Sequence, residues 1–592
     1  MARKTTVVHV THEAVGKVGG IGAVLDGFFT CNSYLDAVDR SILVGPLFTT
    51  EAPPEKRLGE DGTVLYSSID GIAQTSYAPL LSEIERHFNA PIVYGRVAFS
   101  DHGGGVESSQ EALLVDVRNT APGPVNELKR RLYEEFGICS DLYEHLWEYE
   151  QYVRAAPVAI EALKVIGAAT DGTIVIAHEF MGMPTALAAI LEPSCDFKTA
   201  FYAHEVATMR RIAEGHPGHD TMFCNVLRRA AAERVYVTEL FGRQDSFFKH
   251  SLVEASRYCD GIFAVGRNIA DELRFLAPEF EAAEIDVVYN GIPAYQISVA
   301  DRLGSKGKLQ QYCENLLGFR PDFVFTHVTR LIVSKGLWRD LEVLYKLEER
   351  FRADGETAVF FLLSTQVSQR PKRDIENMES AYGWPVAHRE GWPDMSGGES
   401  DLYTAIQQFN AGSRNIKIVF INQFFKRDNC GRKMPPGLDF MDFRRGTDVE
   451  FGQSVYEPFG ISQLEPLTFG GICVVSNVCG CAGFLQDVTG GQPVENVIVA
   501  DYTQLSDAEF KNIEDLLQID RQLRNRIEAT EAARVASEIL QRLGGTDAEI
   551  ARMIQTGYSL AKHMSWDVVV QDYLLPGLQK CRKRGQKFCA KV

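Results

Sequence analysis

Glu457 and Glu465 lie within the stretch SVYEPFGISQLEPLTFGG, where their spacing suits a site for a phosphorylated sugar. Between them, Gly460, Ile461 and Ser462 are typical of a helix start, whose free backbone N–H groups can receive diphosphate oxygens. Glu457 would then face a sugar attached to the phosphate. Glu465, about one turn further along, could accept both hydroxyls of a ribose. The alternative is an acidic residue that only complements the helix dipole. It would account for Glu457 but not for the GISQ residues that follow.

Two basic residues, Arg330 and Lys335, follow a predicted strand over Phe323–Val328 in the segment TRLIVSKG. Arginine offers a planar fork of donors and lysine a compact charge, a combination suited to neutralising a leaving diphosphate. The alternative is two solvated surface charges, which is the commoner fate of these residue types.

A glycine-rich turn follows the first predicted strand, Thr6–Val10, in THEAVGKVGGIGAVL. Gly19 and Gly20 would let backbone amides approach a phosphate at the start of an amphipathic helix, and Lys17 adds a positive charge. The spacing does not match the dinucleotide-binding fingerprint. A tight turn with a surface lysine explains the pattern equally well.

Two His-Glu pairs end neighbouring predicted strands. His178–Glu179 follows Thr173–Ala177, and His204–Glu205 follows Thr199–Ala203. A histidine at such a strand end can hydrogen-bond sugar hydroxyls or a reacting centre. A histidine satisfied by local backbone is the alternative for either pair alone, but two pairs at consecutive strand ends favour a site.

Short apolar runs that alternate with helical patterns must position these residues. Such runs predict parallel strands buried on both faces, and hence an α/β protein with two doubly wound domains. In open parallel sheets ligands bind beyond the carboxyl ends of the strands, where the glycine turn with Lys17, the two His-Glu pairs and the Arg330–Lys335 pair are expected. The remaining strands are expected at Arg40–Val44, Gly261–Val265, Asp286–Tyr289, Ala358–Leu363, Ile416–Ile421, Gly471–Ser476 and Asn496–Ala500.

The chain is expected to change domain between Asn290 and Asp322. The predicted domains are an N-terminal one over 1–300, a nucleotide-sugar-binding one over 320–565, and a C-terminal helix with a basic tail over 566–592. Two stretches, Gln366–Glu399 and Lys426–Thr447, have the Pro, Gly and charge content of irregular loops. Arg444–Arg445 in the second stretch is expected to be solvated.

The composition excludes several classes of protein. With 592 residues, 45% hydrophobic and 24% charged, the chain is typical of a globular protein. Its net charge of −18 argues against a nucleic-acid partner. No run is long enough for a membrane span or a signal peptide, and the 12 scattered cysteines lack zinc spacing. We therefore expect a cytoplasmic protein without membrane contact, and leave a homo-oligomer open.

KVGGIG, Arg330 with Lys335, and EPFGISQLEPLTFGG resemble motifs of the glycogen and starch synthases, retaining glycosyltransferases of the GT-B fold. HEF at His178–Phe180, YNGI at Tyr289–Ile292 and HMSWDVVVQDYL near the C-terminus are similar to other parts of that family. The resemblance covers nearly the whole chain. It implies two Rossmann-like domains facing a deep interdomain cleft, with a C-terminal helix that crosses back.

The resemblance also implies a substrate, a nucleotide sugar that is ADP-glucose or UDP-glucose. Lys17 with the Gly19–Gly20 turn would touch its phosphate and sugar. Glu457 would contact the glucose, and Glu465 the ribose. The acceptor implied is the non-reducing end of an α-1,4-glucan.

The reaction implied is front-face substitution with retention, catalysed by positioning and charge stabilisation. Arg330 and Lys335 would stabilise the leaving diphosphate, and His204 would lie near the anomeric carbon. No metal or other cofactor is implied, and no acidic cluster of the DxD kind stands in a suitable place.

Three departures leave the nucleotide base open. Ala23 replaces the acid that bacterial and plant synthases usually carry, and Glu205 replaces Asn or Ala. The surroundings of Ile42–Leu47 look more like the animal and fungal enzymes, whereas the spacing of Arg330 and Lys335 looks like the bacterial and plant ones.

Two other functions are compatible with these motifs. One is transfer to a small sugar or sugar phosphate, as in the sucrose- and trehalose-synthesising relatives. The other is a catalytically silent glucan-binding protein. The presence together of Lys17, Arg330, Lys335 and Glu457 argues against the silent protein.

Overall fold

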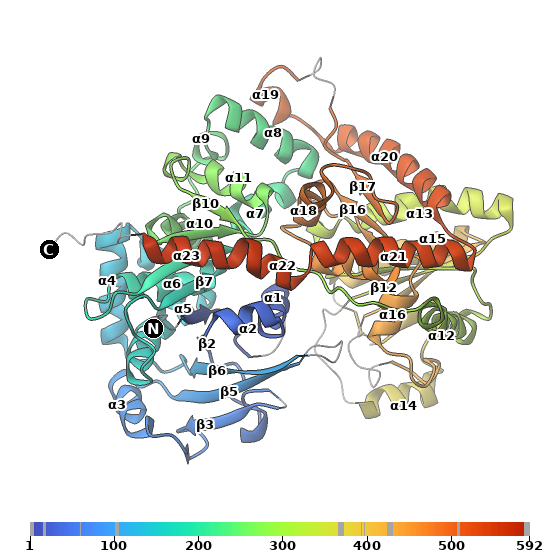
Figure 1. Cartoon of the computed structure of the whole chain (residues 1–592). Coiled ribbons are helices and arrows are strands. Elements are labelled where there is room, and N and C mark those ends of the chain that lie inside the picture. Colours follow the sequence, from blue (N-terminus) through green and yellow to red (C-terminus); the bar gives the residue numbers. More distant parts are fainter. Residues whose placement is uncertain are drawn as a thin grey trace. The chain divides into compact units, whose positions relative to one another are not determined.

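The protein forms two compact units, seen in a computed structural model (Figure 1). Unit 1 combines Met1–Met209, Ala230–Gly291 and Trp566–Val592, and unit 2 combines Arg210–Arg229 and Ile292–Ser565. The structure describes residues 5–15, 19–59, 61–100, 106–364, 372–391, 394–395, 397–422, 430–505 and 510–584.

Unit 1 is built on a ten-stranded sheet in the order β10-β9-β8-β7-β1-β2-β6-β5-β3-β4. The strands from β10 to β6 pair in parallel, and β5, β3 and β4 extend one edge in antiparallel pairing. The bounds are β1 Thr6–Val10, β2 Arg40–Pro46, β3 Thr63–Ser67, β4 Ile72–Ala73, β5 Ile92–Ser100, β6 Glu107–Val115, β7 Ile174–His178, β8 Lys198–Ala203, β9 Gly261–Ala264 and β10 Ile285–Val287.

Helices of unit 1 pack on this sheet, with α6 against β1, β7 and β8. Helix α6 is almost wholly buried because residues such as Met183, Ala186 and Leu187 are apolar all round it. The helices are α1 Gly20–Phe29, α2 Asn32–Ala37, α3 Ala78–Phe88, α4 Pro122–Phe136, α5 Trp147–Val165, α6 Glu179–Ile190, α9 Val237–Phe241, α10 Phe248–Glu254, α11 Arg267–Leu276, α22 Trp566–Val569 and α23 Leu575–Lys583.

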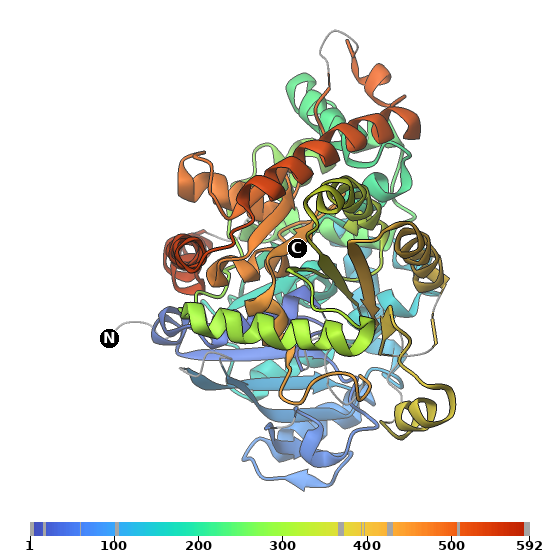
Figure 2. The ribbon, with the colours of Figure 1, turned by 90° about the vertical axis from the view of Figure 1, so that its right-hand side faces the viewer.

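Unit 2 contains a seven-stranded parallel sheet in the order β13-β14-β12-β11-β15-β16-β17. Alternate residues of the strands enter two separate apolar clusters, so both faces are buried. Helices α13, α15 and α20 line one cluster and α12 with α16 the other. Figure 2 shows helices on both faces of this sheet. The strands are β11 Phe323–Val328, β12 Ala358–Leu363, β13 Arg389–Glu390, β14 Ile416–Ile421, β15 Val449–Gly452, β16 Ile472–Ser476 and β17 Val497–Ala500.

Several helices of unit 2 begin at clear capping residues. Ser298 and Asp301 form a reciprocal capping box at the start of α12, and Asp439 and Asp442 do the same for α16. The helices are α12 Val299–Leu317, α13 Leu337–Asp354, α14 Lys372–Tyr382, α15 Gly397–Gly412, α16 Phe440–Gly446, α17 Ile461–Leu464, α18 Gly480–Thr489, α19 Ile513–Leu516, α20 Arg521–Arg542 and α21 Asp547–His563. Helices α7 Ala207–Gly215 and α8 His219–Glu233 span the division between the units.

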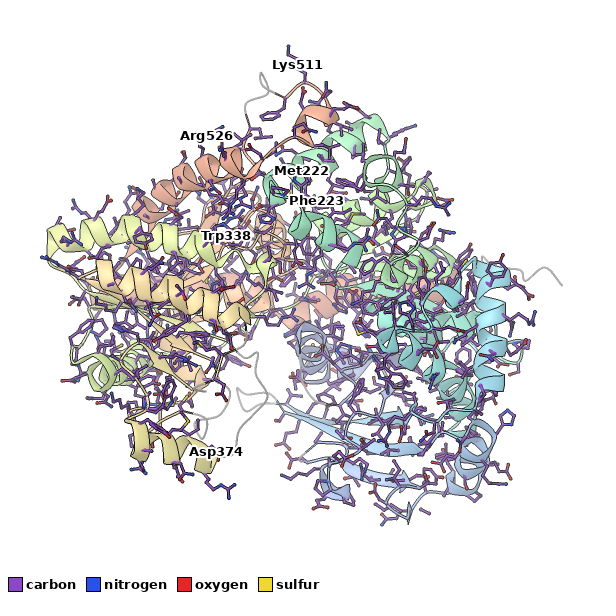
Figure 3. All side chains as sticks on the ribbon, turned by 180° about the vertical axis from the view of Figure 1, so that it is seen from behind. Met222, Phe223, Trp338, Asp374, Lys511 and Arg526 are labelled. Carbon is purple, nitrogen blue, oxygen red and sulfur yellow. The ribbon has the colours of Figure 1, made fainter. Side chains whose placement is uncertain are left out.

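The segment Arg210–Arg229 lies early in the sequence but packs within unit 2. Arg339 of α13 holds it there, because its guanidinium donates to both carboxylate oxygens of Asp220 at 2.6 and 3.0 Å. Glu528 of α20 accepts from Nε of the same arginine at 2.9 Å. Figure 3 labels Met222 and Phe223 of this segment near Trp338, the neighbour of Arg339. The expected 1–300 domain therefore differs from unit 1 at this segment.

The last part of the chain belongs to unit 1, together with the first strands. The indole of Trp566 fills space beside Gly27, where a Cβ would lie 2.1 Å from the ring. Helix α23 contacts β7, β8 and β9, and the Nζ of Lys580 lies 2.5 Å from Asp286.

The prediction of an α/β protein with two largely parallel sheets is confirmed, and every predicted strand is present within two residues of its expected ends. The strands β3 to β6, β13 and β15 were not predicted. The stretches expected as loops contain α14, β13 and α16, so that expectation was wrong for those parts. The interdomain cleft stays a prediction. Among the described residues, no helix is both long and apolar enough to span a membrane.

Candidate functional site

Each sheet has one point where consecutive connections leave in opposite directions. In unit 1 it lies between β1 and β7, and in unit 2 between β11 and β15. Open α/β sheets bind ligands at the carboxyl ends of the strands at such points. The predicted site residues follow these strands or their neighbours.

In unit 2, Lys335 and Glu457 meet across the switch point. Lys335 ends a short 3-10 turn after β11, and Glu457 lies in the loop after β15. The Nζ of Lys335 is hydrogen-bonded to Oε2 of Glu457, and both side chains are mostly buried. An anionic ligand of Lys335 would therefore have to compete with Glu457, and a ligand of Glu457 would have to compete with Lys335. Arg330, two residues beyond β11, is exposed and has no ion pair with any described residue.

A helix begins at the expected position but is short. Gly460 has a φ of +94°, and a Cβ there would lie 2.6 Å from Oε1 of Gln463, so the turn requires glycine. Ile461 and Ser462 open the four-residue α17, which continues as a 3-10 turn from Glu465. A helix this short has little macrodipole. Anion binding there would depend on individual N–H groups and nearby cations.

The contacts of Arg444 hold this short helix in place. Pro466 lacks the N–H that would bond the carbonyl of Ser462, and Nη2 of Arg444 donates to that carbonyl instead. Nη1 donates to Glu450 at 3.0 Å, and Nε lies 3.0 Å from Oε2 of Glu465. The Arg444 side chain is 1% exposed. The expectation of a solvated arginine was therefore wrong, because α16 directs it inward.

Glu450 of β15 is the buried partner that was not predicted. Its carboxylate also accepts from the backbone N–H of Val328 at 3.1 Å and from the hydroxyl of Thr326, its register partner on β11. Burial raises the pKa of Glu450, while the charge of Arg444 acts in the opposite direction. Arg444 and Glu450 thus tie both strands of the switch point to Glu465. The capping pair Asp439–Asp442, which marks a helix leading to Arg444, was the sequence signal for it.

In unit 1, the glycine turn is partly covered by an acid. The amides of Gly19 and Gly22 both donate to Oε2 of Glu13 at 2.8 Å. A phosphate at the Gly19 amide would have to displace this carboxylate, and the predicted contact stays a prediction. Gly20 is exposed. Lys17 lies outside the described residues.

His204 follows β8 and is half-buried. Its Nε2 lies 2.9 Å from Nδ1 of His178, the last residue of β7. The next residue, Glu179, has a strained φ of +62°, and its carboxylate accepts from the backbone N–H of Glu205. The two predicted His-Glu pairs are thus interlinked, histidine to histidine and glutamate to backbone.

The predicted residues form two groups, one on each unit. Lys335, Glu457 and the α17 start with Glu465 share one sheet edge in unit 2, and Gly19, Gly20 and His204 belong to unit 1. Within the described ranges, no group of three or more His, Cys, Asp or Glu is arranged to hold a metal ion. That no cofactor is needed stays a prediction.

Known structures define the class of fold. The chain is similar to the catalytic domain of starch synthase IV from Arabidopsis thaliana bound to ADP and acarbose. The TM-score is 0.53 at 14% identity, with 98% of this chain and 100% of that chain covered. The expected GT-B fold, with two Rossmann-like domains, is therefore confirmed.

Sequence comparison indicates which protein family the chain is similar to. The chain is 30% identical over 83 residues to glycogen [starch] synthase isoform 2 of Saccharomyces cerevisiae, and 27% identical over 140 residues to glycogen [starch] synthase of Dictyostelium discoideum. These matches span 14% and 23% of this chain, and 11% and 15% of the relatives. No protein-family model matches. The resemblance to glycogen and starch synthases is thus supported in sequence, over short segments.

Proposed function

We propose that the protein is a retaining glucosyltransferase that moves glucose from ADP-glucose or UDP-glucose to the non-reducing end of an α-1,4-glucan. The observation that carries the proposal is the meeting of Lys335 and Glu457 at the switch point of a GT-B sheet, with the exposed Arg330 after the same strand as Lys335. Local similarity to glycogen synthases supports the choice of glucan.

In the proposed reaction, the bond between the anomeric carbon and the diphosphate oxygen breaks, the acceptor oxygen bonds to the same face of that carbon, and the acceptor hydroxyl gives its proton to the departing diphosphate oxygen. Arg330 and Lys335 stabilise the negative charge that develops on the diphosphate. Glu457, released from Lys335, accepts hydrogen bonds from the glucose hydroxyls.

The nucleotide would lie along α17. Backbone N–H groups of Gly460, Ile461 and Ser462 would bind the diphosphate, and Glu465 would accept the ribose hydroxyls. Nε of Arg444 lies 3.0 Å from Oε2 of Glu465, and the other carboxylate oxygen would be the one that accepts from the ribose.

From unit 1, Lys17 and Gly20 would contact the donor, and His204 would bind the sugar near the anomeric carbon. The amide of Gly19 would stay with Glu13. Effective catalysis by this set is a matter of positioning and fixed charge, worth several orders of magnitude in rate.

The experiment is incorporation of radiolabelled glucose from ADP-glucose and UDP-glucose into glycogen that can be precipitated. Label in the polymer, removed by an enzyme specific for α-1,4 linkages, is the expected result. Label only in a small soluble product would replace the glucan with a small sugar or sugar phosphate. Intact sugar nucleotide in every reaction would favour a silent glucan-binding protein, and Lys335→Ala serves as the inactive reference.

A further inference from the structure

Three histidines of unit 1 lie in an unbroken chain of hydrogen bonds that ends at a tyrosine and a serine. Nε2 of His204 lies 2.9 Å from Nδ1 of His178, whose Nε2 lies 2.9 Å from Nδ1 of His9. Nε2 of His9 lies 2.8 Å from the hydroxyl of Tyr34, which lies 3.0 Å from Oγ of Ser41. This hydrogen-bond chain consists of four contacts in a row.

The hydrogen-bond chain runs from the candidate site into the core of unit 1. His9 lies in β1 and His178 ends β7, the two strands of the switch point, and His204 follows the adjacent β8. His9 and His178 are fully buried, whereas His204 is half-buried. Nδ1 of His204 has no hydrogen-bond partner among the described residues and is the open end of the chain.

Aromatic rings surround these imidazoles. Phe29 meets His9 edge-on with ring centroids 5.4 Å apart, and Tyr202 lies 4.2 Å from His204. Burial lowers the pKa of His9 to about 3 and also lowers the pKa of His204. The pKa of His178 is lowered by burial and further by its two histidine neighbours. All three rings are therefore neutral at pH 7.

Neutrality couples the three tautomers. A neutral imidazole has one N–H donor and one acceptor nitrogen, so each contact needs a donor facing an acceptor. The three rings must therefore all carry the proton on Nδ1, or all on Nε2. If one ring were in the other tautomer, two donors or two acceptors would face each other in the core, which would lower the free energy of unfolding.

Accounting for the hydroxyl hydrogens selects one of these two arrangements. If the rings carry Nε2 protons, His9 donates to Tyr34, Tyr34 donates to Ser41, and the buried Ser41 hydrogen has no acceptor among the described residues. If the rings carry Nδ1 protons, Ser41 donates to Tyr34 and Tyr34 donates to His9. Every hydrogen then has an acceptor, as buried polar groups require.

We propose that His9, His178 and Tyr34 are positioning residues that hold His204 as its Nδ1-protonated tautomer. His204 then presents a neutral N–H donor at the open end of the chain, suited to an oxygen acceptor such as a sugar hydroxyl. That the ligand is the donor sugar rests on the proposed function. The coupling of the tautomers does not.

The test uses the full chain labelled with ¹⁵N-histidine, because ¹⁵N spectra distinguish the two neutral tautomers. Each signal is assigned with a single variant, and His250→Asn serves as a control because His250 is buried but bonds Thr208 instead. We expect His9, His178 and His204 all to be Nδ1-protonated at pH 7. An Nε2-protonated His204 in the unaltered protein overturns the proposal.

Two hydroxyl variants then separate coupling from local packing. Tyr34→Phe keeps the ring stacked on Phe28 but removes the donor to His9, so the Nε2 form of His204 should grow, two rings away. Ser41→Ala leaves Tyr34 able to donate, so His204 should not change. An unchanged His204 in Tyr34→Phe overturns the coupling. Should that variant fail to fold, His178→Phe, which cuts the chain, must give mixed His204 tautomers.

Kinetics connect the chain to the reaction. In Tyr34→Phe we expect kcat with the nucleotide sugar to fall about three- to tenfold, as for one misplaced hydrogen bond, with KM nearly unchanged. Ser41→Ala should stay within about twofold. Equal kcat in all three proteins would remove the positioning role. If no nucleotide sugar is turned over, the proposed function fails while the spectra still decide the coupling.

Discussion

The two switch points occupy the same place in their sheets but hold opposite chemistry. In unit 1, the hydrogen-bonded row that links β1, β7 and the residue after β8 consists of imidazoles and hydroxyls without formal charge. Unit 2 fills the corresponding place with full charges, in the pair Lys335–Glu457 and in Arg444 between Glu450 and Glu465.

The two units are therefore sensitive to different changes. A neutral chain keeps its geometry as long as no ring gains a proton, so pH is its weak point. A buried ion pair keeps its geometry as long as both partners are present, because removing one leaves an uncompensated charge. Four measurements on the protein test this difference between the two units.

Arg444→Met should have the largest effect. It leaves the fully buried Glu450 without its cation, so we expect a loss of about 3–5 kcal/mol in the free energy of unfolding of unit 2, measured with urea. Arg445→Met is the matched control, because this neighbouring arginine is partly exposed. Equal losses in the two variants would show that Arg444 is not the centre of the charged network.

Glu457→Ala and Lys335→Ala should each lower turnover by about 100- to 1000-fold, because a fixed charge at the reacting centre is lost. The remaining partner keeps some contact with solvent, because the two side chains are 16% and 12% exposed, so the circular dichroism spectrum should stay that of a folded protein even where the melting temperature falls. Lys346→Ala, at an exposed position of α13, is the control and should keep full turnover. Near-normal turnover in either site variant would refute its role.

Acid should destabilise unit 1 before unit 2. The folded-state pKa values of His9 and His178 lie far below 6.5, so below pH 6.5 the unfolded chain binds protons that the folded unit does not. Stability from these two groups is complete above that pH and falls by up to about 1.4 kcal/mol per histidine and pH unit below it. Hydrogen exchange at pH 5.5 against pH 7 should show about 2.5 kcal/mol less protection in unit 1. His9→Phe should reduce the pH dependence, and an unchanged slope would contradict this reading.

The smallest effect separates a neutral from a charged acceptor. Ser41→Ala removes a hydroxyl that serves the neutral Tyr34, at a cost of about 1 kcal/mol. Thr326→Val removes a hydroxyl that serves the carboxylate of Glu450, at a cost of about 2 kcal/mol. Thermal unfolding of the two variants measures both, and a larger loss in Ser41→Ala would reverse the contrast.

The centres of both sheets could be predicted from sequence, and their edges could not. Central strands such as Ile416–Ile421 are continuous apolar runs because both faces are buried. Strand β15, Val449–Gly452, carries Glu450 in its middle, and β6 begins ESSQ, so neither has such a run. A charged residue such as Glu450 is unexpected in a buried strand unless a partner for its charge, here Arg444, is also known.

Much the same holds for the site. The positions of Arg330 and Lys335 after a strand, and of Glu457 before a helix, could be inferred from local motifs. The partners of these residues could not, because Glu13, His9 and Arg444 act through contacts that distant parts of the chain create. Sequence spacing places a side chain on an element. It does not say what that side chain meets.

The slot that Trp566 fills beside Gly27 and Gly291 has a consequence for synthesis. Trp566 leaves the ribosome after about 270 residues of unit 2 have followed Gly291. At ~5–20 residues per second, unit 1 waits roughly 15–55 seconds for its last helices. During that time, the surface of β7, β8 and β9 that α23 later covers is open to chaperones, and the first unit begun is the last one finished.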